Sequence, residues 1–80
     1  MKILLFGSLR EDIAGEVAEE VPVEGCSIRV LRERLVARDP SYAPLGRPSV
    51  LACVDQEIVR DDRVVRPGQE VAFFRPVSGG

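Results

Sequence analysis

The chain has 80 residues, enough for one hydrophobic core and too few for a second domain. Its net charge of −2 lacks the cationic excess that a nucleic-acid partner would require, and no apolar run approaches the ~20 residues of a membrane span. The apolar stretch within residues 1–7 is too short for a signal peptide, so we expect a cytoplasmic protein.

The first predicted element is a strand over residues 2–7. Its apolar side chains are continuous rather than alternating, which indicates that both faces of the strand are covered. After a loop at Ser8–Gly15, the alternation of valine and glutamate over Glu16–Glu24 predicts a second strand. Pro22 predicts an edge or a break in pairing, because proline has no backbone N–H to donate.

The next element is a helix over Ile28–Arg38, opened by Gly25, Cys26 and Ser27. The hydroxyl of Ser27 suits an N-cap, since it can accept a hydrogen bond from an unpaired backbone N–H. One apolar stripe along the helix is formed by Ile28, Leu31, Leu35 and Val36. Four charged residues lie largely off this stripe: Arg29, Arg32, Glu33 and Arg34. Pro40 stops the helix, because the residue before a proline avoids the helical conformation.

The second half of the chain reads as a loop and then short strands. Ser41–Ser49 is predicted as a loop because it contains two prolines and a glycine. Strands follow at residues 50–54, 57–59, 64–65 and 69–75, and Pro76 ends the last one. The turns between them are marked by Asp55-Gln56, Asp61-Asp62 and Pro67-Gly68. We interpret Asp55 and Asp61 as turn formers rather than paired catalytic carboxylates, and Arg10–Asp12 and Arg60–Arg63 as solvated loops.

This element order predicts an α+β fold, in which one main helix crosses one face of a mixed sheet of four or five strands. The first and last strands should be parallel neighbours at the centre of the sheet, because both are apolar on both faces. Phe73 should face the core, whereas Phe74 points the other way. The uncovered face should carry Leu4 or Phe6, Phe74 and Ile58, and such a patch usually marks a protein–protein contact.

The residue types that are missing exclude several kinds of site. Without histidine, the chain can build neither a Ser-His or Cys-His nucleophile pair nor a histidine zinc site. Two cysteines, Cys26 and Cys53, are too few for an iron–sulfur cluster. We therefore expect no bound metal or cofactor, and we favour reduced thiols over a disulfide or a reactive thiol.

The sequence ends on Gly79 and Gly80. A terminal glycine leaves a carboxylate with no side chain beside it, on a backbone slender enough for a narrow slot. The four residues from Val77 can reach ~13 Å beyond the last strand, far enough to enter another protein's active site. The alternative is a frayed terminus without a function. Ser78 is not expected to be a nucleophile, because the chain supplies no general base.

These features together resemble the MoaD-type ubiquitin-like sulfur carriers, the small subunits of molybdopterin synthase. The resemblance extends over the whole chain: a short apolar first strand, a single helix after the second strand and, most specifically, the ending GQEVAFFRPVSGG. It implies a ubiquitin-like β-grasp domain over residues 1–76 and a flexible tail over residues 77–80.

The resemblance also implies a mechanism. In this family an E1-like enzyme adenylylates the terminal glycine with ATP, and sulfur then replaces AMP to leave a thiocarboxylate. The tail enters the large synthase subunit, where its sulfur passes to cyclic pyranopterin monophosphate and builds the dithiolene of molybdopterin. Gly80 would carry the sulfur, and Gly79 would be the slender approach to it. The residues that would contact the partners are Phe6, Ile58, Phe74, Arg75, Pro76, Val77 and Ser78.

The implied partners are a MoaE-type large subunit, in a heterotetramer, and a MoeB-type adenylyltransferase, with the sulfur donor unspecified. The chain alone is not expected to be an enzyme. Arg75 replaces a proline that is common in the family, which keeps open a ThiS-type carrier for the thiamine thiazole. A ubiquitin-like modifier is a further alternative, although Lys2 is the only lysine on which chains could be built. A binding module with an inert tail is the last alternative.

Overall fold

The computed structural model describes residues 2–6 and 16–76, apart from the side chains of Lys2, Phe6, Glu16 and Val17. The predicted loop at Ser8–Gly15 and the predicted tail at Val77–Gly80 lie outside these residues. The elements in chain order are β1 (Lys2–Phe6), β2 (Glu16–Ala18), β3 (Cys26–Ser27), α2 (Ile28–Arg38), the 3₁₀ helix η1 (Pro40–Gly46), β4 (Leu51–Val54), β5 (Glu57–Val59), β6 (Val64–Val65) and β7 (Val71–Phe74). Neither helix in this part of the chain is long and apolar enough to cross a membrane.

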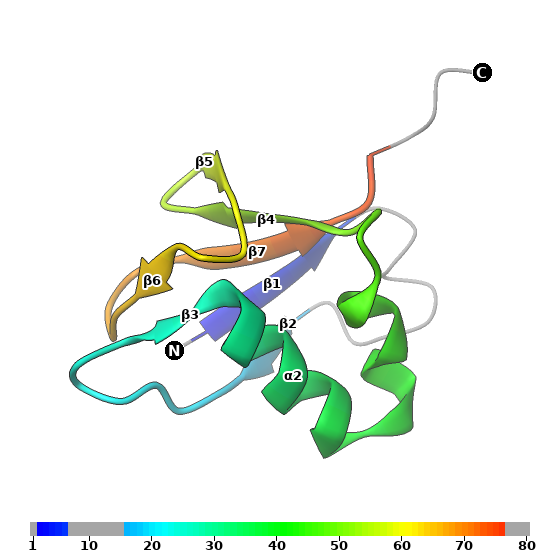
Figure 1. Ribbon diagram of the computed structural model, residues 1–80, viewed down its shortest axis with the longest axis horizontal. Coiled ribbons are helices and arrows are strands. Elements are labelled where there is room, and N and C mark those ends of the chain that lie inside the picture. The colour runs from blue at the N-terminus through cyan, green and yellow to red at the C-terminus, as the bar shows by residue number, and fades with distance from the viewer. Residues whose placement is uncertain (1, 7–15, 77–80) are drawn as a thin grey trace.

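The main sheet has five strands in the order β2-β1-β7-β4-β5 (Figure 1). β1 and β7 are parallel neighbours, with Leu5 beside Phe73, and the other pairs in the sheet are antiparallel. The prediction of a mixed sheet with the first and last strands side by side in its interior is confirmed. Because β7 joins β1 to β4, the strand that leads to the C-terminus is held on both edges.

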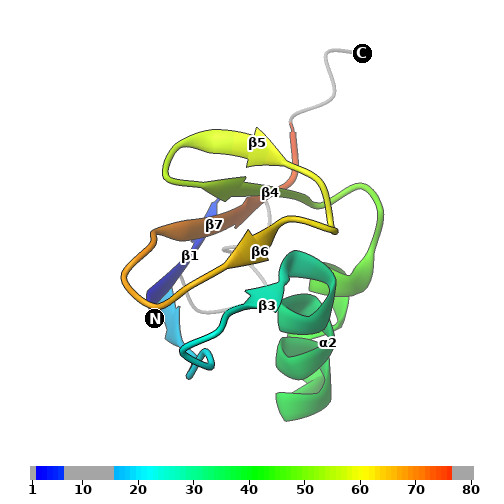
Figure 2. The same ribbon diagram turned by 60° about the vertical axis from the view of Figure 1, so that its left-hand side comes forward.

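Helix α2 crosses one face of this sheet (Figures 1 and 2). It begins where predicted, since the hydroxyl of Ser27 accepts a hydrogen bond of 3.2 Å from the backbone N–H of Val30. The core between helix and sheet consists of Ile3, Leu5, Ile28, Leu31, Leu35, Leu45, Val50, Ala52, Val54, Val65, Val71 and Phe73, all 0–1% exposed. The predicted helical stripe therefore packs on one face of the sheet and leaves the other face without a helix from the described residues.

The strand predicted over Glu16–Glu24 is mostly wrong. Pairing stops at Ala18, and the chain turns at Pro22, whose carbonyl accepts a hydrogen bond of 2.8 Å from the N–H of Gly25. Gly25 has a φ of +92°, a conformation that glycine adopts without strain. Cys26 and Ser27, expected only to open the helix, instead form β3 and pair with β6 in a separate two-stranded sheet.

The loop predicted over Ser41–Ser49 is also corrected, because its first part is the helix η1. Asp39 caps η1 by accepting a hydrogen bond of 2.8 Å from the N–H of Ser41, and Pro40 stands at a first-turn position, where no backbone N–H is needed. Leu45 is fully buried against the core. The prolines therefore shape a short helix here rather than preventing one.

Candidate functional site

The face of the sheet opposite α2, here called the open face, carries an apolar patch. Strand alternation sends one set of side chains to the core and the other set to this face. The apolar patch is defined by Leu4, Leu51, Cys53, Ile58, Ala72 and Phe74. Its members come from four neighbouring strands, so the patch is contiguous across the middle of the sheet and its β5 edge.

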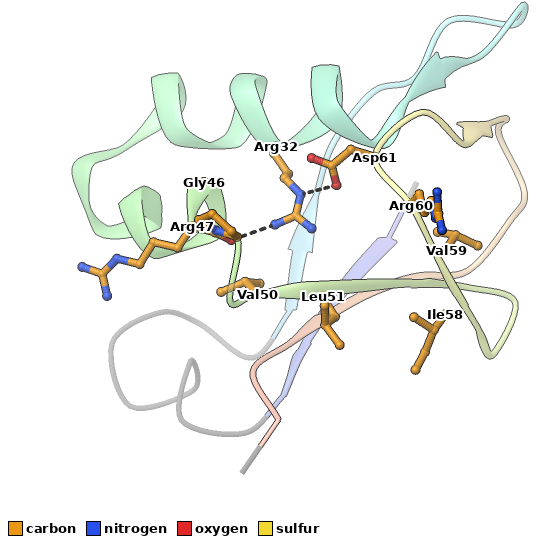
Figure 3. A pocket seen from close by; sticks show the side chains of 10 residues that line it. Arg32, Gly46, Arg47, Val50, Leu51, Ile58, Val59, Arg60 and Asp61 are labelled. Carbon is orange, nitrogen blue, oxygen red and sulfur yellow. Dashed lines mark hydrogen bonds and ion pairs between the residues drawn. The ribbon is translucent and has the colours of Figure 1, made fainter. Parts of the chain in front are cut away.

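The register shows how the patch is assembled. Leu51 lies opposite Phe74, Cys53 lies opposite Ala72, and Ile58 lies opposite Cys53 on the next strand. Ile58 is 62% exposed, whereas Phe74 is half-buried and lines a pocket of about 260 Å³ with Cys53, Ala72 and two polar residues. Figure 3 shows Leu51 and Ile58 projecting from the β4–β5 hairpin on the side away from α2. A large exposed aliphatic side chain on the same apolar face as a half-buried aromatic ring is the surface pattern of a contact site.

Of the predicted contact residues, the structure describes the side chains of Ile58, Phe74, Arg75 and Pro76. Phe73 is fully buried and Phe74 lies on the opposite face, as predicted. The backbone of Phe6 pairs with that of Phe74, but its side chain lies outside the description, as do residues 77–80. Arg75 and Pro76 are exposed and follow β7 directly. β7 therefore contributes Ala72 and Phe74 to the patch and leads directly to Arg75 and Pro76.

Both cysteines are free thiols, in agreement with the favoured interpretation. Cys53 sits within the apolar patch, and its burial raises the pKa of the thiol above the ordinary value. A raised thiol pKa lowers the fraction of thiolate, the nucleophilic form, at neutral pH. Burial thus disfavours the nucleophilic thiolate form of Cys53 within the apolar patch.

Arg32 is the residue that the sequence interpretation placed wrongly. It is buried, with 8% exposure, and its guanidinium lies over the ring of Phe73 at 5.2 Å from the centroid. Its Nη1 donates to the carbonyl of Leu45 at 2.8 Å. Its Nε donates to Asp61 Oδ1 at 3.1 Å, and Figure 3 shows this pair. Asp61, expected in a solvated loop, is therefore half of an ion pair. The spacing of four residues from Ile28 could have placed Arg32 beside the apolar stripe.

The Arg32 pair lies in a pocket of about 570 Å³ between η1 and the β4–β5 hairpin. The pocket is also lined by Leu51, Ile58 and Arg60, so it is continuous with the edge of the apolar patch. Within residues 2–6 and 16–76, no group of His, Cys, Asp and Glu side chains could hold a metal ion.

Comparison with known proteins identifies a family and relatives for this chain. Residues 3–80 match the sequence model of the ThiS family. The chain is 37% identical to the molybdopterin synthase sulfur carrier subunit of Escherichia coli, over 100% of this chain and 99% of that protein. It is 28% identical to the protein of the same name in Haemophilus influenzae, over the same shares of the two chains.

Among solved structures, SAMP1 from Haloferax volcanii superposes with a TM-score of 0.79 at 23% sequence identity. The superposition covers 99% of this chain and 97% of that one. At this identity the likeness concerns the fold, which is the predicted ubiquitin-like β-grasp fold. The neighbours in sequence and in structure both cover the chain nearly end to end.

Proposed function

We propose that this chain, which belongs to the ThiS family, is the sulfur-carrier small subunit of a molybdopterin synthase. The observation that carries the proposal is the full-length match to such a subunit at 37% identity, together with a family match that continues through residue 80. The chain carries the sulfur and docks on its partners, and the catalytic groups belong to those partners.

The reactive group is the carboxylate of Gly80. A carboxylate is a poor electrophile, so it must first be activated. Attack of its oxygen on the α-phosphorus of ATP, in an E1-like adenylyltransferase of the MoeB type, gives an acyl-adenylate and releases pyrophosphate. Sulfide-level sulfur then attacks the acyl carbon, AMP leaves, and a thiocarboxylate remains. Gly79 keeps the approach narrow enough for the slot in which this exchange takes place.

The second partner is the large subunit of the synthase, of the MoaE type. There the thiocarboxylate passes its sulfur to cyclic pyranopterin monophosphate. A dithiolene contains two sulfur atoms, so two carriers are consumed for each molybdopterin, which fits a heterotetramer with two small subunits. The apolar patch, together with Phe6, docks on the large subunit and on the adenylyltransferase in turn, and the two partners compete for it.

Reconstitution tests the proposal. The purified chain is incubated with the adenylyltransferase and large subunit of its own source, ATP, inorganic sulfide and cyclic pyranopterin monophosphate. Intact mass should show one oxygen of the chain exchanged for one sulfur, and molybdopterin should form only when both the modified chain and the large subunit are present. A modified chain that yields no molybdopterin with the large subunit would overturn the pathway assignment.

The alternatives give different products in the same kind of assay. A carrier for the thiamine thiazole would form the thiocarboxylate but deliver its sulfur to a thiazole synthase instead of the large subunit. A protein modifier would appear as an isopeptide conjugate on lysines of other proteins, and a binding module would keep its free acid. Native mass spectrometry of the chain from its source cell distinguishes the thiocarboxylate, the conjugate and the free acid.

The docking surface is tested by substitution at Ile58. Because Ile58 is 62% exposed, Ile58→Asp should leave the melting temperature unchanged, yet weaken binding of the large subunit by roughly 10-fold or more through burial of an unpaired charge. Val23 is 85% exposed in the turn before β3, so Val23→Asp is the matched control and should bind normally. Phe74→Ala should weaken binding by on the order of 1–3 kcal/mol. Equal losses for Ile58→Asp and Val23→Asp would contradict docking through the patch.

A further inference from the structure

The charged residues around the open face are divided between its two ends. At one end stand three exposed arginines, Arg47, Arg60 and Arg75, whose side chains make no ion pair or hydrogen bond within the described part of the chain. At the other end stand three exposed carboxylates, Asp55, Glu57 and Glu70. The protein as a whole has a net charge of only −2, so this division is local.

The strand register fixes the position of the arginines. Leu51, at the start of β4, lies opposite Phe74 at the end of β7, and Arg75 follows directly. Ala52 lies opposite Val59, the last residue of β5, and Arg60 follows there. Arg47 is joined to the start of β4 by a hydrogen bond of 3.1 Å from the N–H of Val50 to its carbonyl.

These three positions therefore share the end of the sheet from which the chain continues toward its C-terminus. Figure 2 shows β5 and β7 ending on the side where β4 begins. Arg60 also lines the same pocket as Leu51 and Ile58 (Figure 3), so the basic end is continuous with the apolar patch. We call these three arginines, Arg47, Arg60 and Arg75, the basic rim.

The acidic end is built by the opposite turns. Asp55 and Gln56 form the β4–β5 turn, and Asp55 accepts a hydrogen bond of 2.9 Å from the backbone N–H of Glu70. Glu57 begins β5, and its carboxylate lies 3.7 Å from Arg63. The apolar patch lies between the basic rim and these carboxylates.

Three other arginines have carboxylate partners, whereas Arg29, Arg34 and Arg66 make no ion pair within the described part of the chain. Arg32 pairs with Asp61, Arg38 with Glu19 and Arg63 with Glu57. The basic rim is therefore distinguished by its position, since its exposed arginines lie at one end of the sheet beside an exposed apolar surface. The planar guanidinium suits bidentate pairing with carboxylates, and such pairs gain strength where an apolar contact excludes water. A nucleic-acid phosphate backbone fits poorly, because the acidic end of the same face would repel it.

We propose that the basic rim pairs with an acidic surface at the mouth of the slot in which the large subunit receives the tail; this rests on the proposed function. Arg75 is only two residues from the tail, so whatever encloses the tail must also face the basic rim. Carboxylates at the slot mouth attract the basic rim, so the carrier approaches with its C-terminal end toward the slot. The acidic end of the open face disfavours the reversed orientation. The charges thus set the docking orientation, and the apolar patch supplies most of the affinity.

Association kinetics with the large subunit test this proposal. At about 20 mM salt, Arg60→Glu and Arg75→Glu should each lower the association rate constant by roughly 3- to 10-fold, and the double variant should lower it further. At about 500 mM salt these differences should largely disappear, because exposed charges are screened. The matched control is Arg66→Glu, which makes the same change in net charge at an exposed arginine in the turn before β7, near the acidic end.

Each outcome has a distinct meaning. If Arg66→Glu slows association as much as Arg60→Glu, only net charge matters, and the proposal of an acidic slot mouth is overturned. The same holds if Ile58→Asp weakens binding while neither rim variant changes the association rate. If the unmodified carrier does not bind the large subunit at all, the proposed function is overturned, and this inference with it. Melting temperatures of all variants should match the parent, since the substituted side chains are exposed.

Discussion

At the scale of single residues, Arg32 joins the helix, η1 and the loop after β5. Its guanidinium binds the carbonyl of Leu45 and the carboxylate of Asp61, and it covers the ring of Phe73. Arg32→Met keeps the apolar stem but removes those hydrogen bonds, and should lower the free energy of unfolding by roughly 2–4 kcal/mol. Urea denaturation measures the change.

The control is Arg34→Met on the same helix. Arg34 is exposed and donates to the carbonyl of Glu20, so its loss should change stability by about 0.5 kcal/mol or less. Asp61→Asn should lower the free energy of unfolding less than Arg32→Met does. The Asp61 side chain is 41% exposed, and the amide oxygen of the new asparagine can still accept the hydrogen bond from Arg32 Nε. Equal effects at Arg32 and Arg34 would show that the buried hydrogen bonds contribute little.

Cys53 provides a chemical probe of the open face. Burial raises the pKa of its thiol, so alkylation by iodoacetamide should be slower at neutral pH than for an unstructured cysteine peptide, and should accelerate only at more alkaline pH. Because Cys53 belongs to the apolar patch, binding of the large subunit should slow its alkylation further. Cys26, in β3 of the second sheet, should keep its rate and serves as the internal control. Mass spectrometry of the alkylated peptides would reveal the opposite pattern if docking used the β3 side.

At the scale of elements, the hydrophobic pattern predicted what packs into the core. The continuous apolar runs of the first and last strands placed β1 and β7 side by side, and the stripe from Ile28 to Val36 with its Ser27 cap gave α2 its bounds. The pattern did not reveal β3, because Cys26 and Ser27 pair with a distant strand through backbone groups. It also did not reveal η1, where Pro40 and Pro44 are accommodated in a short 3₁₀ helix.

The candidate site, too, could be predicted from the sequence only in part. Phe74 and Ile58 could be placed on the open face from alternation alone, since their exposure follows from strand register. The division of charge around them required the three-dimensional structure. Arg60 follows β5 and Arg75 follows β7, and only the pairing of both strands with β4 brings these two arginines to the same end of the sheet.

The turn that joins β2 to β3 gives a prediction about backbone conformation. Gly25 and Gly68 both have positive φ, +92° and +95°. A Cβ at Gly25 would lie 2.7 Å from the carbonyl oxygen of Val65 and 2.8 Å from a methyl of Val64, whereas nothing lies within 4 Å of one at Gly68. Gly68→Ala should therefore cost only the left-handed strain of about 1–2 kcal/mol, and Gly25→Ala clearly more. Thermal denaturation compares the two variants; equal costs would mean that β6 yields to the added methyl.

At the scale of the whole molecule, β7 connects stability to function. Val71 and Phe73 hold it in the core, Ala72 and Phe74 place it on the open face, and Arg75 follows it directly, before the proposed reactive end. The fold thus places the end of β7 beside the proposed docking surface. Folding and sulfur transfer should accordingly be separable by changes at the tail.

Two tail variants test this separation. Deleting Gly80 should leave the melting temperature unchanged and abolish acceptance of sulfur, because the terminal residue would no longer reach the activating site. Gly79→Val keeps the terminal carboxylate but adds a β-branched side chain that widens and stiffens the segment entering the slot. It should also leave the fold intact and block the exchange, a failure that is steric rather than chemical.

Each variant is incubated with the adenylyltransferase, ATP and inorganic sulfide, and intact mass shows whether one oxygen has been replaced by one sulfur. A Gly80 deletion that still gains sulfur, or a Gly79→Val chain that gains it at the parent rate, would refute a terminal glycine pair as the reactive end.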